Sequence, residues 1–279
     1  MSGNNTSLPK TTVTAKVLLI LGAFTPRRPV LSLTEICERT GLTAPTAYRL
    51  AAELVSWGAL GRSPAGTYRI GLRLWEVGTL APEARTLRQL AQPCLQDLFA
   101  ATGSSVQLAV REGGHALCVE KIVGRQATPQ PSHIGQRLPL HATAVGKVLL
   151  AFSPPEVRDA VIRGALRRFT PYTIFTPGRL AQALEQARQA GFATSVEEMS
   201  LGTLAVAAPV CDSSGSVIAA ISVEGRCTAL NVQRAKAAVL AAASGITREA
   251  ARRPVLGALR EPAPLLGQPS VRVPARARE

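Results

Sequence analysis

The chain has 279 residues, enough for one large domain or two ordinary ones, with 46% hydrophobic and 18% charged residues. This balance excludes wholesale disorder and a fibrous repeat. Its 32 basic residues outnumber the 18 acidic ones and give a formal net charge of +14. Such a surplus favours a polyanionic partner, with nucleic acid before anionic membrane, although a merely solubilising charge would have the same sign.

The cysteines and the N-terminal residues indicate the compartment. Five cysteines are scattered along the chain without any C-x-x-C pair: Cys37, Cys94, Cys118, Cys211 and Cys227. This pattern predicts free thiols in a reducing cytosol, and neither a disulfide framework nor a zinc ribbon. The first residues, MSGNNTSLPKTT, are polar and lack the apolar core of a secretory signal. The best apolar run, residues 17–24, is far shorter than the roughly eighteen residues of a membrane helix. We therefore expect a cytoplasmic protein that binds no membrane.

Charge and proline divide the chain into segments. Residues 1–79 hold nine basic and four acidic residues, a higher positive charge per residue than in the segment that follows. Residues 253–279 contain five prolines and follow neither a helical nor a strand period, which predicts a disordered tail. The polar residues 1–11 are likewise predicted to be disordered.

Two helices joined by a short turn are predicted after a first helical pattern at residues 14–24. Ser32 and Glu35 have the spacing of a capping box, in which each side chain accepts a hydrogen bond from the other residue's amide. Gly41 supplies the left-handed stop. Thr43 then caps a third helix, with Pro45 in its first turn, where a proline costs little. The arrangement is typical of a helix-turn-helix.

The third helix carries an apolar stripe at positions 47, 50, 51 and 54, and this leaves Thr46, Tyr48 and Arg49 on other faces. A turn at residues 63–66 and alternation over residues 67–70 then predict a hairpin with arginines, typical of a wing. With the basic balance, these features favour DNA binding, whereas the alternative is a small three-helix bundle without a ligand. The candidate DNA contacts are Thr43, Thr46, Tyr48, Arg49 and Arg62. Arg49 could instead pair with Glu53, four residues further on.

The second half of the sequence alternates strand and helix patterns in a way that suggests an α+β fold. Strands are predicted at residues 104–111, 116–123, 204–210 and 217–224, and helices at 142–152, 155–165, 179–190 and 232–252. In the last strand, Val217, Ala219, Ile221 and Val223 are predicted to face the core, while Ile218, Ala220, Ser222 and Glu224 face the other way.

No enzyme motif stands out. His115, His133 and His141 occur in no nucleophile–base pattern, and the chain lacks a G-x-S-x-G sequence, a P-loop and an H-E-x-x-H sequence. Glu197 and Glu198 are neighbours whose side chains would point apart on an extended chain. We predict no catalytic residue, no metal ligand and no cofactor.

Five segments together resemble the IclR family of bacterial transcriptional regulators, and the resemblance covers roughly residues 12–252. They are LSLTEICERTGLTAPTAYRLAAELVSWGAL, YRIGLRLWEVG, IGQRLPLHATAVGKVLLA, GFATSVEEMSLGTLAVAAPV and GSVIAAISVEG. The resemblance implies a winged helix-turn-helix over residues 12–71, a linker helix over 72–90 and a GAF-like α/β effector domain over 91–252. It also implies a homodimer or homotetramer on paired operator half-sites of double-stranded DNA. One departure concerns the third helix, which often opens with lysine and serine in the family and has Ala44 and Pro45 here.

The resemblance also implies an effector site in the second domain. It places the effector at Thr143, Ala144 and Val145, where the leading amides of a helix suit a carboxylate or another anion. The alternative is an ordinary helix start capped by the Thr143 hydroxyl. The pocket wall would comprise Ser195, Ala205, Ser222 and Glu224, positions that often hold Asp, Cys, Ser and Ser in the family. For Glu224 the alternative is a strand-end carboxylate paired with Arg226 in solvent.

The sequence therefore predicts a ligand-responsive transcriptional regulator whose effector is a small acidic metabolite. Effector binding would change operator occupancy through the linker helix. Two alternatives stay open: a metabolite-binding protein without a DNA function, and an enzyme with an unrecognised site. An operator-binding experiment separates the first interpretation from both alternatives.

Overall fold

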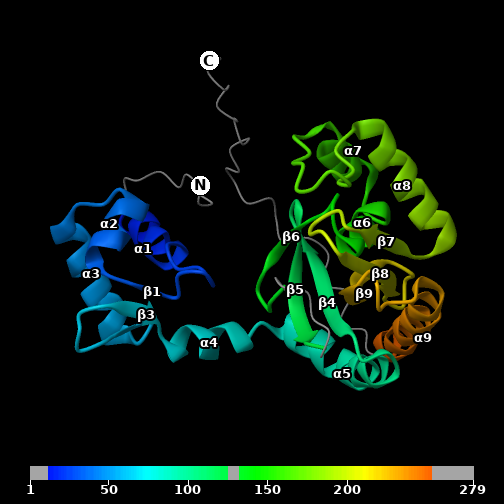
Figure 1. Cartoon of the computed structure of the whole chain (residues 1–279). Coiled ribbons are helices and arrows are strands. Elements are labelled where there is room, and N and C mark those ends of the chain that lie inside the picture. Colours follow the sequence, from blue (N-terminus) through cyan, green and yellow to red (C-terminus); the bar gives the residue numbers. More distant parts are fainter. Residues whose placement is uncertain (1–11, 125–131, 253–279) are drawn as a thin grey trace, which may run out of the picture. The chain divides into compact units, whose positions relative to one another are not determined.

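The computed structural model describes residues 12–124 and 132–252, and these divide into two units between Ala81 and Pro82 (Figure 1). The disorder predicted for residues 1–11 and 253–279 falls outside the described residues. None of the described helices is long and apolar enough to cross a membrane.

The first unit combines four helices with a small sheet. In chain order the elements are α1 (Val13–Gly22), β1 (Val30–Leu31), α2 (Leu33–Thr40), α3 (Ala44–Trp57), β2 (Leu60–Arg62), β3 (Tyr68–Ile70) and α4 (Leu72–Thr79). The three strands are antiparallel in the order β1-β3-β2, so that β2 and β3 form the predicted hairpin. Its core is made of buried side chains from all three helices that precede the hairpin and from the strands, among them Ile20, Ile36, Leu50 and Tyr68.

Local capping explains where α2 begins and ends. The Ser32 amide donates to Glu35 Oε2 at 2.8 Å, and the Glu35 amide donates to Ser32 Oγ at 3.2 Å. The hydrogen bond from the Ser32 amide lowers the pKa of the Glu35 carboxyl. Gly41 ends the helix in the left-handed conformation, with φ 69°. Both predicted signals of this helix are confirmed.

Two predictions about neighbouring helices are wrong. Thr43 holds the N-cap position of α3 but its side chain makes no capping hydrogen bond; its hydroxyl donates to Thr46 Oγ1 at 3.0 Å. The linker helix expected over 72–90 is two helices, α4 and α5 (Pro82–Thr102). Pro82 stands at the start of the second, since a proline lacks the amide that would continue the first helix.

The second unit is built on a six-stranded antiparallel sheet in the order β6-β5-β4-β9-β8-β7. Its strands are β4 (Ser105–Glu112), β5 (His115–Ile122), β6 (Arg137–Pro139), β7 (Ala193–Val196), β8 (Thr203–Cys211) and β9 (Val217–Arg226). Its helices besides α5 are α6 (Ala144–Ala151), α7 (Pro155–Arg163), α8 (Pro177–Ala190) and α9 (Val232–Ala251). The predicted α+β class is confirmed.

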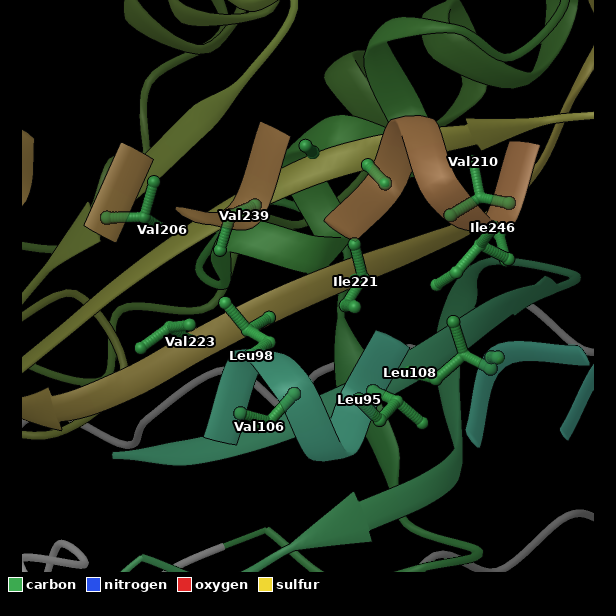
Figure 2. Packing of buried hydrophobic residues seen from close by; sticks show 14 of the residues in the cluster. Leu95, Leu98, Val106, Leu108, Val206, Val210, Ile221, Val223, Val239 and Ile246 are labelled. Atoms are coloured by element: carbon green, nitrogen blue, oxygen red, sulfur yellow. The ribbon is translucent and has the colours of Figure 1, made fainter. Parts of the chain in front are cut away.

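Helices cover both faces of the sheet. On one face, Leu95 and Leu98 of α5 and Val239 and Ile246 of α9 pack against strand residues such as Ile221 (Figure 2). On the other face, α6 and α8 pack against small side chains of the sheet, among them Ala109, Ala207 and Ala220. The short side chains let α6 lie close to the strands, and every residue of α6 is buried.

The alternation predicted for β9 holds from Ala219 onward and fails at its first two residues. Ile221 and Val223 belong to the core beneath α5 and α9, and Ala220 to the core beneath α6. Ile218, however, packs with the first core and Val217 with the second. The register shifts between Val210 and Cys211 of β8, and such an irregularity exchanges the faces of the residues beyond it.

Candidate DNA-binding surface and effector site

Helix α3 buries the predicted apolar stripe of Ala47, Leu50, Ala51 and Leu54. The candidate contacts lie on the rest of its surface: Thr43, Tyr48 and Arg49 are exposed and Thr46 is half-buried. A helix of this kind can present its exposed residues to the major groove of DNA. The polar residues are thus available to a ligand in the manner that the helix-turn-helix requires.

Arg49 makes the pair with Glu53 that the sequence left open. The distance from Nη1 to Oε1 is 2.7 Å, and the two side chains are 60% and 58% exposed. An exposed pair one helical turn apart contributes at most about 1 kcal/mol, because water screens both charges. Arg49 can therefore leave Glu53 and bind a phosphate or a base with little loss of free energy.

Arg62 connects the hairpin to α3. Its guanidinium carbon lies 5.7 Å from the ring centre of Tyr48 and 5.6 Å from that of Tyr68. Both distances are within the range of a cation–π contact. The structure therefore brings together Tyr48 and Arg62, two residues that the sequence named separately.

The hairpin and the start of α4 are held against the end of α3 by close backbone packing. A side chain at Gly71 would place its Cβ 2.1 Å from the carbonyl oxygen of Gly58. Only glycine fits there, since no Cβ approaches a backbone oxygen so closely. Arg73 adds a contact 4.8 Å from the Trp57 ring.

In the second unit, the hydroxyl of Thr143 caps α6, as the alternative interpretation expected. Thr143 Oγ1 accepts from the Gly146 amide at 3.1 Å and donates to the Pro139 carbonyl at 2.9 Å. The earlier amides, those of Ala144 and Val145, have no acceptor within the helix. No acidic residue lies in the first turn. The cap therefore occupies the Gly146 amide. The amides of Ala144 and Val145 and the positive end of the helix dipole remain able to bind an anion.

The sheet register gathers the proposed pocket-wall residues. Ser195 of β7 lies opposite Ala205 of β8, and Ala205 lies opposite Glu224 of β9. Directly paired residues share a face, so these three form one row across the sheet. Ser222 lies two residues before Glu224 and on the same face, the face that α6 covers.

Hydrogen bonding differs between the two serines. Ser195 Oγ donates to the Ala142 carbonyl at 3.1 Å, which ties β7 to the segment just before α6. Ser222 is completely buried, and among the described residues its Oγ has no hydrogen-bond partner. An unpaired buried hydroxyl costs free energy that a bound ligand can recover.

A chain of buried polar groups beside Glu224 was missed by the sequence analysis. Lys121 Nζ donates to Ser132 Oγ at 2.6 Å, and Ser132 Oγ donates to Gln107 Oε1 at 2.6 Å. Lys121 also pairs with Glu224 Oε2 at 3.4 Å, with side chains 2% and 13% exposed. The solvent pairing of Glu224 with Arg226 is therefore wrong. The alternation of Gln107 with buried Val106 and Leu108 was the available signal.

Cys118 lies in the same sheet. Its thiol is buried and donates to the Glu120 carbonyl, and burial raises its pKa to about 11. A thiol so rarely ionised is a poor nucleophile, as is usual for a cysteine packed in a core. Within residues 12–124 and 132–252, no three side chains of His, Cys, Asp or Glu cluster as a metal ion requires.

Comparison with known proteins gives matches over both units. A family model described as the IclR helix-turn-helix domain matches residues 13–64, and one described as bacterial transcriptional regulator IclR C-terminal matches 81–251. The transcriptional regulator XynR of Escherichia coli is 36% identical over 209 residues, 74% of this chain and 83% of XynR. KipR of Bacillus subtilis is 32% identical over 77% of this chain and 86% of its own length.

Solved structures of IclR proteins match both units of this chain as well. An IclR homologue from Microbacterium hydrocarbonoxydans, complexed with 4-hydroxybenzoate, has a TM-score of 0.81 and 31% identity, covering 86% of this chain and 99% of its own. The IclR structure from Thermotoga maritima has a TM-score of 0.70 and 27% identity, with 85% and 98% covered.

Proposed function

The chain belongs to the IclR family of bacterial transcriptional regulators, and on this premise we propose that its effector is a small hydroxylated acid. As a member it is a DNA-binding transcriptional regulator, with a helix-turn-helix domain and a C-terminal domain that senses a small molecule. The relatives are named as regulators, and in our proposal the effector is bound without being chemically changed. DNA as the partner also leads us to propose the cytoplasm as its location.

The acidic end of the effector is proposed to lie at the start of α6. The observation that carries this is the Ser222 hydroxyl, which is buried on the sheet face that α6 covers and has no partner in the described part of the chain. The amides of Ala144 and Val145 and the positive end of the helix dipole attract an anion without a basic side chain. A carboxylate there would accept a hydrogen bond from Ser222, with Thr143, Ser195 and Ala205 completing the site.

The other end of the effector is proposed to carry a hydroxyl group. Glu224 is paired with Lys121, and a second carboxylate placed beside this pair would be repelled by the Glu224 carboxylate. A hydroxyl can donate to Glu224 at no such cost. The similar structure from Microbacterium hydrocarbonoxydans holds 4-hydroxybenzoate, a molecule with this pair of groups.

Calorimetric titration tests the effector proposal with 4-hydroxybenzoate and its dicarboxylate analogue terephthalate as probes. We expect the hydroxy acid to bind more tightly, and Ser222→Ala to weaken it roughly 2- to 12-fold, the value of one hydrogen bond of about 0.5–1.5 kcal/mol. Glu224→Gln should narrow the difference between the two probes. Ser244→Ala, an exposed position on α9, is the matched control. If Ser222→Ala and Glu224→Gln both bind as the wild type does, the effector lies elsewhere.

We propose that Thr43, Thr46, Tyr48 and Arg49 of α3 contact the operator in the major groove and that Arg62 contacts its backbone. Exposure of the side chains on α3 supports the first part. The place of Arg62 at the end of β2, next to the turn of the hairpin, supports the second.

We also propose that two copies associate through α4. This helix has no buried residue, and its Leu72 and Trp75 are 78% and 69% exposed. Leu72 and Trp75 lie one turn apart and point away from Leu74, which packs on the core of the first unit. Exposed apolar groups of this size in adjacent turns suit a self-complementary contact in a symmetric dimer. Analytical ultracentrifugation of Trp75→Glu should show a lower apparent mass than the wild type, and an unchanged mass would contradict this interface.

A further inference from the structure

A buried ion pair in the second unit involves none of the residues proposed to contact the effector. Lys147 of α6 donates from Nζ to Oε1 of Glu198 at 2.5 Å, and the two side chains are 5% and 8% exposed. Burial lowers the pKa of Lys147, and the charge of Glu198 opposes that effect. Glu198 follows β7 (Ala193–Val196) by two residues.

The second carboxylate oxygen of Glu198 is unsatisfied. Oε2 is buried, and none of the residues in the described part of the chain donates a hydrogen bond to it. Native proteins rarely leave a buried charged acceptor without a donor, because the lost hydration costs several times the energy of an ordinary hydrogen bond. Since the described residues supply no donor, a bound molecule could provide one.

A cavity of about 270 Å³ adjoins this pair and is lined by both Lys147 and Glu198. The remaining walls combine apolar side chains, among them Ile174, Phe192 and Ala183 and Ala187 of α8, with the polar residues Gln186 and Thr194. The volume is close to the lower limit of small-molecule sites, about 300 Å³. It shares no residue with the effector site proposed above, which uses Thr143–Val145, Ser195, Ala205, Ser222 and Glu224.

We infer that this cavity binds a second small molecule, a neutral one with an apolar body and an amide or alcohol group that donates to Glu198 Oε2. Lys147 and Glu198 neutralise each other, so a charged ligand would leave one charge unbalanced beside a buried ion pair. An acceptor without a donor selects an N–H or O–H group. The apolar side chains of the walls, such as Ile174 and Phe192, suit an apolar body for the remainder of the ligand.

Benzamide and benzoate form a matched pair of probes for this site. They share shape and ring, but only benzamide is neutral and carries N–H donors. Binding of each probe to the full chain is measured by saturation-transfer NMR, which detects weak ligands. We expect benzamide to bind the wild type, with benzoate unable to displace it from this cavity.

Two substitutions on α8 locate the binding. Ala183→Leu fills the cavity from a half-buried wall position, whereas Ala181→Leu makes the same change at an exposed position outside it. We expect benzamide to bind at least tenfold more weakly to Ala183→Leu and unchanged to Ala181→Leu. Glu198→Gln, provided that it folds, should weaken benzamide as well.

Three results would overturn the inference. One is an absence of benzamide binding to the wild type, which would mean that the cavity holds water alone. Another is equal benzamide affinity in Ala183→Leu and Ala181→Leu. The third is a loss of benzamide binding in Ser222→Ala, which would indicate that benzamide binds in the proposed effector site and not in this cavity. None of these depends on whether the acidic effector has been identified correctly.

Discussion

The second unit contains buried ion pairs alongside exposed ones, whereas the ion pair described for the first unit is exposed. In the first, Arg49 and Glu53 form a pair in which each side chain is more than half exposed. In the second, Lys147–Glu198 and Lys121–Glu224 are pairs in which no side chain is more than 13% exposed. The difference teaches what each unit can recognise. An exposed arginine can exchange its carboxylate partner for a DNA phosphate. Buried charges keep their positions and so fix where a small ligand must place its polar groups.

The largest expected effect is the loss of operator affinity with salt. If a dimer makes about 6–10 phosphate contacts, its affinity should fall roughly 10³–10⁵-fold between about 50 and 200 mM salt, because counterions are released on binding. Fluorescence anisotropy with labelled operator DNA measures it. The affinity of the effector site should change little over the same range, since its charges are buried. An operator affinity that does not change with salt would contradict the proposed difference between the two units.

Next in size is the loss of stability when one charge of each pair is removed. Lys147→Met should lower the free energy of unfolding of the second unit by about 3–5 kcal/mol, because Glu198 is left buried without its cation. Arg49→Ala should cost at most about 1 kcal/mol. Urea denaturation of both variants makes the comparison. Similar losses would mean that water reaches the buried pair.

A smaller effect is expected when each of the two arginines proposed to contact DNA is replaced by alanine. Arg49→Ala should reduce the preference for operator over random DNA by about 1–3 kcal/mol, the value of a base contact. Arg62→Ala should weaken both DNAs alike and reduce the salt slope by about one. Competition binding with operator and random duplexes distinguishes the two. Equal losses on both DNAs in both variants would show that α3 does not carry the sequence preference.

The smallest effect concerns a single thiol. At pH 8, Cys118 should alkylate much more slowly than the half-buried Cys37, because its pKa of about 11 leaves almost no thiolate. Peptide mapping after iodoacetamide treatment gives both rates in one sample. In denaturing urea the two rates should converge. Rapid labelling of native Cys118 would show that the sheet opens readily.

Signals within a few residues of one another were predicted from the sequence, and those that depend on strand register were not. Ser32, Glu35 and Gly41 define α2 because capping is local. Pro82 carried an equally local signal, yet the resemblance suggested one continuous helix there. Lys121 meets Glu224 only because β4 lies between β5 and β9 in the sheet, and no spacing along the chain contains that information.

The stack of Tyr48, Arg62 and Tyr68 has a consequence for the thermodynamics of operator binding. These contacts hold the hairpin against α3 in the free protein. A segment that is already ordered loses little conformational entropy on binding. The free energy of its contacts with DNA therefore contributes almost fully to the affinity. Loosening the stack should therefore leave the enthalpy of association nearly unchanged and make its entropy less favourable.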